Sequence, residues 1–489
     1  MRILLIDPPF FRFKGANSDI FPVGLGYIAS ILEKHGHFAR VYTAELFAKD
    51  EDSRVATLTR LMDNHSKYID GLYDDNHYIW EEAKKYIAKY APDVVGIAAA
   101  TPKYRSALKI AELAKKNNPS TKVVIGGLHA TIKPDEVASS EFVDAAVRGE
   151  GELTFLELLD AFQKKTNLSE VKGIAFREGE KVIRTQDRPL TDNLDVLPFP
   201  KREHLIDEQQ GLTKYDIIMC SRGCPYSCTF CNTTTIWGKR VRYHSIPAIV
   251  EQMKIIWNQE NTKIQFFDDT FTLNKEWIIS LCNKIMIEGF NPEWSCLTRV
   301  DRLDEEMLIA MKKSGCRHMS IGVESGSQRV LDAMKKGINL ENVHAAEKLL
   351  KKHGMQWGAF FMVGFPYETK EDMHKTLELM KRINCTNIIL SVFTPYPGTE
   401  AFEYVKKLNL LPERIDWENY SHQSPENYFC PNVPFEDFKK IVAEAFRITD
   451  RKNTDIITLL KRLYTKKTFF LTHPKTLIEK IVSVLRVYT

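Results

Sequence analysis

Short apolar runs alternate with amphipathic stretches along the first third of the chain. The runs are bounded by Gly, Pro or Asp, as is typical of strands buried on both faces; they span residues 2–7, 94–100, 122–127 and 145–149. Residues 23–36 and 104–117 place apolar side chains at helical spacing. This alternation predicts an α/β unit over residues 1–165, with a Rossmann-like, doubly wound parallel sheet.

The same alternation restarts after residue 210. Six apolar runs, each followed by a helical pattern, occupy residues 215–220, 263–268, 293–299, 318–324, 356–364 and 387–393. Consecutive strand–helix units of this kind predict a partial (β/α)6 barrel over residues 211–400, with its chemistry at the carboxyl ends of the strands. Residues 166–210 combine a hairpin pattern with an extended segment that contains Pro198 and Pro200, and they are expected to link the two units. Residues 401–489 are expected to be mostly helical.

Charge and hydropathy exclude several kinds of protein. The 489 residues carry 68 basic and 64 acidic side chains, so the net charge of +4 gives no reason to expect a nucleic-acid partner. No stretch approaches the roughly 18 consecutive apolar residues of a membrane span, and nothing resembles a signal peptide. We therefore expect a cytoplasmic protein.

The cysteines are few and unevenly placed. Four of the nine lie within twelve residues, at Cys220, Cys224, Cys228 and Cys231. A single tight cluster in a long chain argues for a metal site rather than for a disulfide framework. The remaining cysteines lie in apolar segments, and we expect them to be small core residues.

The spacing within the cluster narrows the kind of metal site. Three residues separate Cys224 from Cys228, and two separate Cys228 from Cys231. Three thiolates on one loop can hold three irons of a [4Fe–4S] cluster and leave the fourth open. A structural zinc site needs four protein ligands, and Cys220 would have to be the fourth. Because Cys220 ends a predicted strand, we expect it to pack in the core instead.

This motif resembles the radical S-adenosylmethionine superfamily in its spacing, in Phe230 before the last cysteine and in its place after the first barrel strand. The resemblance implies that the open iron chelates S-adenosylmethionine, and that one electron cleaves it to a 5′-deoxyadenosyl radical. It assigns further strand-end residues to S-adenosylmethionine binding, namely Phe230, Asp268, Asp269, Glu324, Ser325, Gly364, Pro397 and Gly398. The alternative to a binding role for Asp268 and Asp269 is structural: Asp269 or Thr272 would cap the helical turn that follows.

The first unit resembles the cobalamin-binding domain found in a branch of the same superfamily. The matching segments read IDPPF (6–10), PVGLGYIASIL (22–32), IGGLHAT (125–131) and VRGEGE (147–152). Glycines at strand ends allow backbone to approach a flat corrin ring closely. The resemblance places cobalamin beside Pro8, Gly126, Gly127, His129, Thr131, Gly149 and Glu150.

The axial histidine of cobalamin mutases is not expected here. Their Asp-x-His-x-x-Gly pattern starts twice, at Asp63 and Asp75, but Tyr68 and Trp80 stand where the glycine should be. His129 is the nearby candidate, and a buried structural histidine is the alternative for it. A nicotinamide site is disfavoured, because no Gly-x-Gly-x-x-Gly opens the first helix.

Together these resemblances imply an enzyme that methylates an unactivated carbon in a cobalamin-dependent radical reaction. One alternative is a non-methylating radical reaction, such as cyclisation, carbon–carbon coupling or dehydration, in the biosynthesis of a lipid, pigment or natural product. Another is a non-catalytic cobalamin or iron–sulfur binding module. The expected partners are a small-molecule or lipid substrate and a reductant such as a flavodoxin or ferredoxin.

The C-terminal tail is basic. Between residues 456 and 489, seven Lys or Arg accompany one acid, Glu479, and apolar residues recur at helical spacing. One interpretation is a helix that makes peripheral contact with an anionic membrane. The other is an amphipathic cap on the barrel with a solvated basic face.

Overall fold

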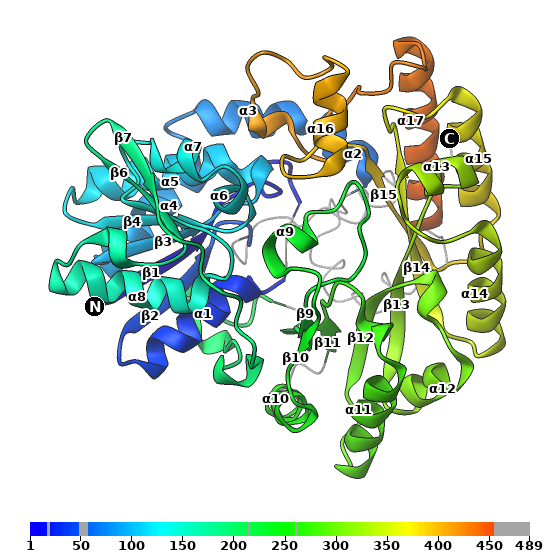
Figure 1. Ribbon diagram of the computed structural model, residues 1–489, viewed down its shortest axis with the longest axis horizontal. Coiled ribbons are helices and arrows are strands. Elements are labelled where there is room, and N and C mark those ends of the chain that lie inside the picture. Colours follow the sequence, from blue (N-terminus) through cyan, green and yellow to red (C-terminus); the bar gives the residue numbers. More distant parts are fainter. Residues whose placement is uncertain (17–19, 48–56, 214–215, 260–262, 454–489) are drawn as a thin grey trace, which may run out of the picture.

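The computed structural model describes residues 1–489 except 17–19, 48–56, 214–215, 260–262 and 454–489. Two sheets with their own helices lie side by side, the first coloured blue to cyan and the second green to yellow (Figure 1). The segment after residue 400 bridges the two units. Its Trp417 donates from Nε1 to Glu136 of the first unit at 2.7 Å, and its last described helix packs on the second sheet.

The first sheet has seven strands in the order β2-β1-β3-β4-β5-β6-β7. The first five are parallel, and a hairpin adds the last two in antiparallel fashion. The strands are β1 Arg2–Asp7, β2 Phe38–Thr43, β3 Val94–Ala98, β4 Lys122–Gly126, β5 Ala145–Val147, β6 Ile174–Glu178 and β7 Lys181–Arg184. The sequence pattern missed β2, because this edge strand carries exposed or half-exposed side chains, Phe38 and Arg40, among its apolar ones.

Helices cover both faces of this sheet. Ile3 and Leu5 of β1 pack with α1 and α8, whereas Leu4 and Ile6 pack with α4 and α5 on the opposite face. The double winding predicted for this unit is therefore confirmed. The helices are α1 Val23–Lys34, α2 Leu58–Asp63, α3 His65–Tyr73, α4 Tyr78–Tyr90, α5 Tyr104–Asn117, α6 Leu128–Ile132, α7 Pro134–Ala138 and α8 Gly151–Lys164.

The second sheet has six parallel strands in the order β15-β14-β13-β12-β11-β8. Its edge strands β8 and β15 do not pair with each other, so the barrel is partial, as predicted. The strands are β8 Asp216–Ile218, β11 Lys263–Phe266, β12 Glu293–Arg299, β13 Cys316–Glu324, β14 Gln356–Val363 and β15 Asn387–Val392. A small ladder of β9 Ser221–Arg222 and β10 Arg242–Tyr243 flanks the first strand.

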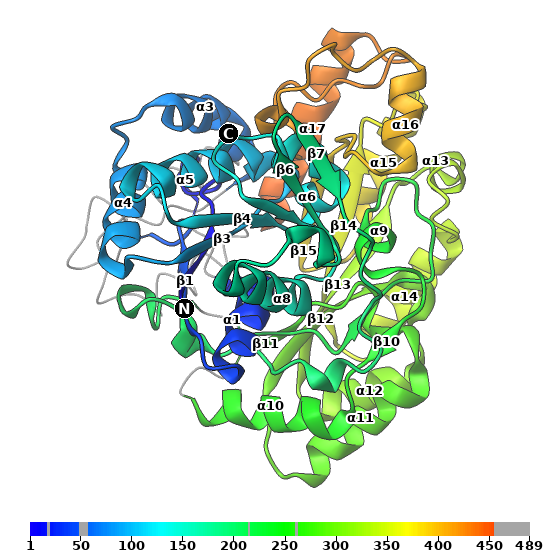
Figure 2. The same ribbon diagram turned by 60° about the vertical axis from the view of Figure 1, so that its left-hand side comes forward.

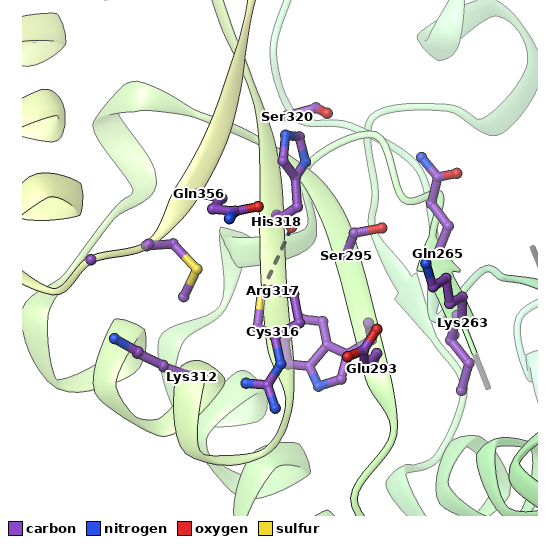
Figure 3. Close-up of a pocket in the computed structure, with 14 residues that line it drawn as sticks. Lys263, Gln265, Glu293, Ser295, Lys312, Cys316, Arg317, His318, Ser320 and Gln356 are labelled. Atoms are coloured by element: carbon purple, nitrogen blue, oxygen red, sulfur yellow. Dashed lines mark hydrogen bonds between the residues drawn. The ribbon is translucent and has the colours of Figure 1, made fainter. Parts of the chain in front are cut away.

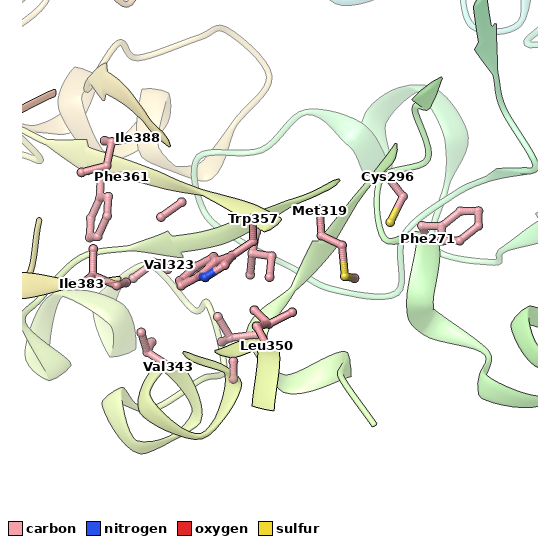
Figure 4. Close-up of a cluster of buried hydrophobic side chains, with 14 of the residues drawn as sticks. Phe271, Cys296, Met319, Val323, Val343, Leu350, Trp357, Phe361, Ile383 and Ile388 are labelled. Carbon is pink, nitrogen blue, oxygen red and sulfur yellow. The ribbon is translucent and has the colours of Figure 1, made fainter. Parts of the chain in front are cut away.

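Helices cover the outer face of this sheet, as both views show (Figures 1 and 2). They are α10 Ile246–Asn258, α11 Lys275–Ile287, α12 Glu305–Lys313, α13 Gln328–Ala333, α14 Leu340–Lys352 and α15 Lys370–Arg382. Met319, Trp357 and Phe361 point from the strands into this layer and meet Val343 and Leu350 of α14 (Figure 4). Cys220, Cys282, Cys296, Cys316 and Cys430 lie in the same core, and Cys385 packs against it, as predicted.

The region after residue 400 is helical, as predicted, in its described part up to residue 453. It contains α16 Glu400–Lys407 and α17 Phe435–Asn453, joined by irregular chain with a short turn at Trp417–Asn419. Asp450 of α17 accepts from Leu58 N at 3.0 Å and from Thr59 Oγ1 at 2.6 Å, which ties this helix to α2. The basic tail lies outside the described residues. Across the described ranges, no helix is long and apolar enough to cross a bilayer.

Candidate functional site

The three cysteines of the motif line one cavity of about 430 Å³ at the carboxyl ends of the barrel strands. They lie on the loop that follows β9 and leads into α9 Thr233–Trp237. Gly223 opens this loop with φ +111°, where a Cβ would lie 2.4 Å from the carbonyl oxygen of Arg240. Only glycine fits there, so the close approach of the two chain segments sets the course of the loop.

Each thiol has its own neighbour. The Sγ of Cys224 lies 3.9 Å from Thr270 Oγ1, that of Cys228 lies 3.9 Å from Arg299 Nη1, and that of Cys231 lies 3.2 Å from Thr233 Oγ1. Burial raises the pKa of the Cys224 and Cys228 thiols. Within the described part of the chain, no three His, Cys, Asp or Glu side chains already converge as metal ligands.

The donor set nevertheless fits a cluster held by three protein ligands. Three thiols share one cavity, whereas Cys220 is 1% exposed and packed in the core. A four-cysteine zinc site is therefore disfavoured. Arg299 and Lys336 also line the cavity, and both lower the pKa of Cys228 against the effect of burial. Their charges favour thiolates, the form that binds iron.

Sequence reasoning missed Arg299, Lys336 and Tyr226. The guanidinium carbon of Arg299 lies 3.7 Å from the centre of the Tyr226 ring. Its Nη2 donates to the carbonyl oxygen of Lys336 at 2.6 Å, and its Nε pairs with Asp301 at 2.9 Å. Arg299 is the last residue of β12, so the strand-end rule that selected the aspartates was a signal for it as well.

The two aspartates after β11 line the cavity and position the cysteine loop. Asp268 is buried and accepts from the backbone nitrogens of Ser221 at 2.6 Å and Cys220 at 3.2 Å; burial raises its pKa to about 7. Asp269 accepts from Thr233 Oγ1 at 2.8 Å, and enclosure by the cavity raises its pKa to about 6. Neither aspartate caps α11, because the side chain of Asn274 does so.

Glu324 and Ser325 do not line the cavity themselves, although Lys336, the partner of Glu324, does. The Glu324 carboxylate pairs with Lys336 Nζ at 2.6 Å, and both side chains are buried. Glu324 has φ +69° at a β-bulge, and a Cβ on neighbouring Gly322 would lie 2.6 Å from its Oε1. Ser325 faces Thr376 of α15, with 3.1 Å between the two hydroxyl oxygens. Glu324 thus acts on the cavity through Lys336.

The two turns at the last strands do not line this cavity. Gly364 has φ +95°, and its backbone nitrogen donates to Glu368, a buried carboxyl whose pKa burial raises to about 8. Gly398 has φ +82°, and a Cβ there would lie 3.1 Å from Ile132 of the first unit. Pro397 before it is buried. Contact of these residues with S-adenosylmethionine stays a prediction.

A second cavity, of about 290 Å³ and mostly apolar, lies at the carboxyl ends of β3, β4 and β5. Gly126, Gly127 and Gly149, which the resemblance assigns to cobalamin, line it together with the start of α1. Gly127 has φ +95°, and a Cβ there would lie 3.1 Å from the carbonyl oxygen of Ala99. Thr131 Oγ1 donates to Gly127 O at 2.9 Å and accepts from Gly149 N at 3.0 Å, so it connects the two glycine turns.

The remaining residues expected beside cobalamin have other contacts. His129 is fully buried; its ring centre lies 4.2 Å from that of Tyr104, and burial lowers its pKa to about 3, which favours the structural interpretation. Pro8 is buried and does not line the cavity. The Glu150 carboxylate pairs with Arg242 at 2.9 Å and with Arg222 at 3.2 Å.

Trp237, at the end of α9, lines both cavities. The guanidinium carbon of Arg222 lies 4.8 Å from its ring and 5.0 Å from the ring of Tyr27 on α1. Arg222 is 1% exposed and pairs with Glu152 at 2.5 Å. The cysteine loop is thereby fixed to the first unit. Sequence reasoning missed these contacts because they join separate units.

Fold and site define an α/β enzyme in which a Rossmann-like unit and a partial barrel meet at two adjoining cavities. Residues 218–380 match the family model of the Radical SAM superfamily, and residues 14–159 match that of the B12 binding domain. An uncharacterised methyltransferase of Pyrococcus horikoshii is 35% identical over 433 residues, which cover 87% of each chain. The chain therefore belongs to the cobalamin-binding branch of the radical SAM superfamily.

Two further comparisons agree. An anaerobic magnesium-protoporphyrin IX monomethyl ester cyclase of Rubrivivax gelatinosus is 28% identical over 379 residues, 73% of this chain and 66% of the relative. The structure of the radical S-adenosylmethionine methyltransferase TsrM of Kitasatospora setae has the same fold, with a TM-score of 0.69 at 17% identity over 92% of this chain and 89% of that one. The family's cofactors are a [4Fe–4S] cluster, S-adenosylmethionine and cobalamin, as predicted. Such enzymes act on a small-molecule substrate and need a reductant.

Proposed function

We propose that this enzyme transfers a methyl group to an unactivated carbon of a small molecule. The observation that carries the proposal is the shared wall at Trp237, which places the thiol-lined cavity next to the glycine-lined one. The cluster and S-adenosylmethionine supply radical formation, and cobalamin supplies the methyl group. A substrate between these cavities would be within reach of both.

We assign the following roles to the chain's own residues. Cys224, Cys228 and Cys231 bind the cluster, and Asp269 positions Cys231 through Thr233. Arg299 and Lys336 offer their charges to the thiolates and to the carboxylate of S-adenosylmethionine. Gly126, Gly127 and Gly149 admit the corrin ring, and Thr131 fixes their turns.

The names of the relatives support methylation but include another reaction. The relative from Pyrococcus horikoshii is a methyltransferase, whereas that from Rubrivivax gelatinosus is a cyclase. The discriminating experiment uses anaerobically purified chain with iron, sulfide and cobalt measured together. The purified chain is then incubated with trideuteromethyl-labelled S-adenosylmethionine, a reductant and a small-molecule extract of the source cells. Label in a product supports the proposal; 5′-deoxyadenosine without labelled product ends it in favour of a non-methylating reaction.

The shared wall itself can be tested by fluorescence. Cobalamin absorbs where tryptophan emits, so bound corrin should quench Trp237. Trp237→Phe should lower the quenched fraction of the emission, whereas Trp257→Phe, on the outer helix α10, should not. Equal quenching in both variants would show that Trp237 does not face the corrin.

We further propose a cytoplasmic enzyme that receives its electron from a reduced flavodoxin or ferredoxin. All nine cysteines are free, which suits a reducing compartment. Peripheral membrane contact through residues 456–489 is also proposed, on their basic, amphipathic sequence. Membranes washed at low ionic strength and neutral pH should retain the full chain but release a variant that ends at residue 455. Equal release of both would remove the membrane contact from the proposal.

A further inference from the structure

A chamber of about 880 Å³ lies at the amino-terminal ends of β11 to β14 (Figure 3). The three motif cysteines line the other cavity, at the carboxyl ends of the strands. The strands expose alternate side chains to its inside. Cys296, Met319 and Trp357 point outward into the helical layer. The lining includes Ile264, Trp294, Cys316 and Met355, and five polar strand residues: Gln265, Ser295, His318, Ser320 and Gln356.

Polar side chains at these positions are unusual, because the inside of an α/β barrel is normally filled by bulky branched apolar residues. Among the described residues, the side chains of Gln265, Ser295 and Ser320 form no hydrogen bond with protein, and neither does that of Gln356. His318 Nε2 lies 2.9 Å from Asn387 Oδ1. The chamber therefore offers hydroxyl and amide groups that nothing else in the described fold uses.

The charges around the chamber select an anion. Lys263, Lys312 and Arg317 line it, against one acid, Glu293. Lys312 donates to the carbonyl oxygen of His353, while Lys263 and Arg317 form no ion pair with any residue that the structure describes. A guanidinium and ammonium groups beside serine hydroxyls match a phosphate group.

The chamber and the thiol-lined cavity, called the cluster cavity from here on, both lie inside the barrel but are separate sites. Gln265 and Ser295 line the chamber, whereas Phe267 and Leu297, two positions further along the same strands, line the cluster cavity. One strand repeat of about 7 Å separates the two layers. We propose that this chamber binds the phosphate group of a small molecule that enters at the amino-terminal end of the barrel.

Pyrophosphate is the probe for this proposal, titrated into the anaerobically purified, cluster-loaded full chain by calorimetry. We expect saturable binding at one site per chain. Reversal of both charges in Lys263→Glu/Arg317→Glu should weaken it by about tenfold or more. Ser320→Phe should abolish it by filling the chamber. Lys313→Glu, an exposed neighbour of Lys312 that does not line the chamber, is the matched control and should bind like wild type.

Reductive cleavage of S-adenosylmethionine to 5′-deoxyadenosine shows that each variant is folded and carries its cluster. If Ser320→Phe fails to fold, the charge-reversed variant carries the test, because both its residues are exposed. Absence of saturable binding, or equal weakening by Lys313→Glu, overturns the proposal. The result is independent of methyl transfer, since a chain that never labels a product is still able to bind pyrophosphate here.

Discussion

The two adjoining cavities are built by opposite means. The cluster cavity is made by side chains that contribute chemistry: three thiols, two carboxyls, a guanidinium and an ammonium group. The second cavity is made largely by missing side chains, with glycines at the ends of β4 and β5 and apolar residues of α1 around them. A site that supplies ligands depends on what its residues are, whereas a site that admits a large flat ring depends on what they lack.

Loss of one thiol is expected to have the largest effect. Cys228→Ser should reduce the bound iron from about four atoms per chain to near background, because two cysteines do not retain the cluster. Formation of 5′-deoxyadenosine should then cease. Cys385→Ser, a cysteine away from the loop, is the control and should keep both. Full iron content in Cys228→Ser would remove this residue from the ligand set.

The contact between the two units comes next. Arg222→Met leaves the buried carboxylates of Glu150 and Glu152 without this partner, so the free energy of unfolding should fall by about 3–5 kcal/mol. Arg184→Met removes an exposed pair with Asp135 and should cost less than about 1 kcal/mol. Denaturant titration of both variants measures the difference. Similar losses would mean that the buried pair does not hold the units together.

Two matched glycine substitutions, with smaller expected effects, test the glycine-lined cavity. Gly127→Ala and Gly36→Ala both place a side chain at positive φ, at a cost of about 1 kcal/mol each. At Gly127 the new Cβ also presses against Ala99 and narrows the cavity, while at Gly36 nothing lies within 4 Å. Cobalt content after anaerobic purification should therefore fall in Gly127→Ala alone. Equal cobalt in both variants would contradict the role of this turn.

The buried carboxyl of Asp268 should make the free energy of unfolding depend on pH. Its pKa is about 7 in the folded chain and 3.8 normally, so the folded state holds its proton more tightly. Between these two pKa values the free energy of unfolding should therefore be greatest at the lower pH. It should decline as the pH rises towards 7, by at most about 1.4 kcal/mol per pH unit. Asp268→Asn lacks this titration. Denaturation of both proteins between about pH 5.5 and pH 8 checks it, and parallel curves would refute the assignment.

Prediction from sequence worked where the signal was local. The apolar runs correctly located ten of the parallel strands, since each strand buries apolar side chains on at least one face. Edge strand β2 was missed because solvent on one side allows a mixed pattern. The motif cysteines and the strand-end aspartates were found for a similar reason, because their order along the chain places them at one rim of the barrel.

The sequence alone determined the α/β class of both units and the three-thiol loop, because periodicity and ligand spacing are properties of neighbouring residues. Only the tertiary structure decided that Glu150 pairs with arginines, that His129 is enclosed by aromatic rings, and that Trp237 is shared by two cavities. These contacts join residues far apart in the chain, and a side chain's role there is set by which partner the packing brings within a few ångströms.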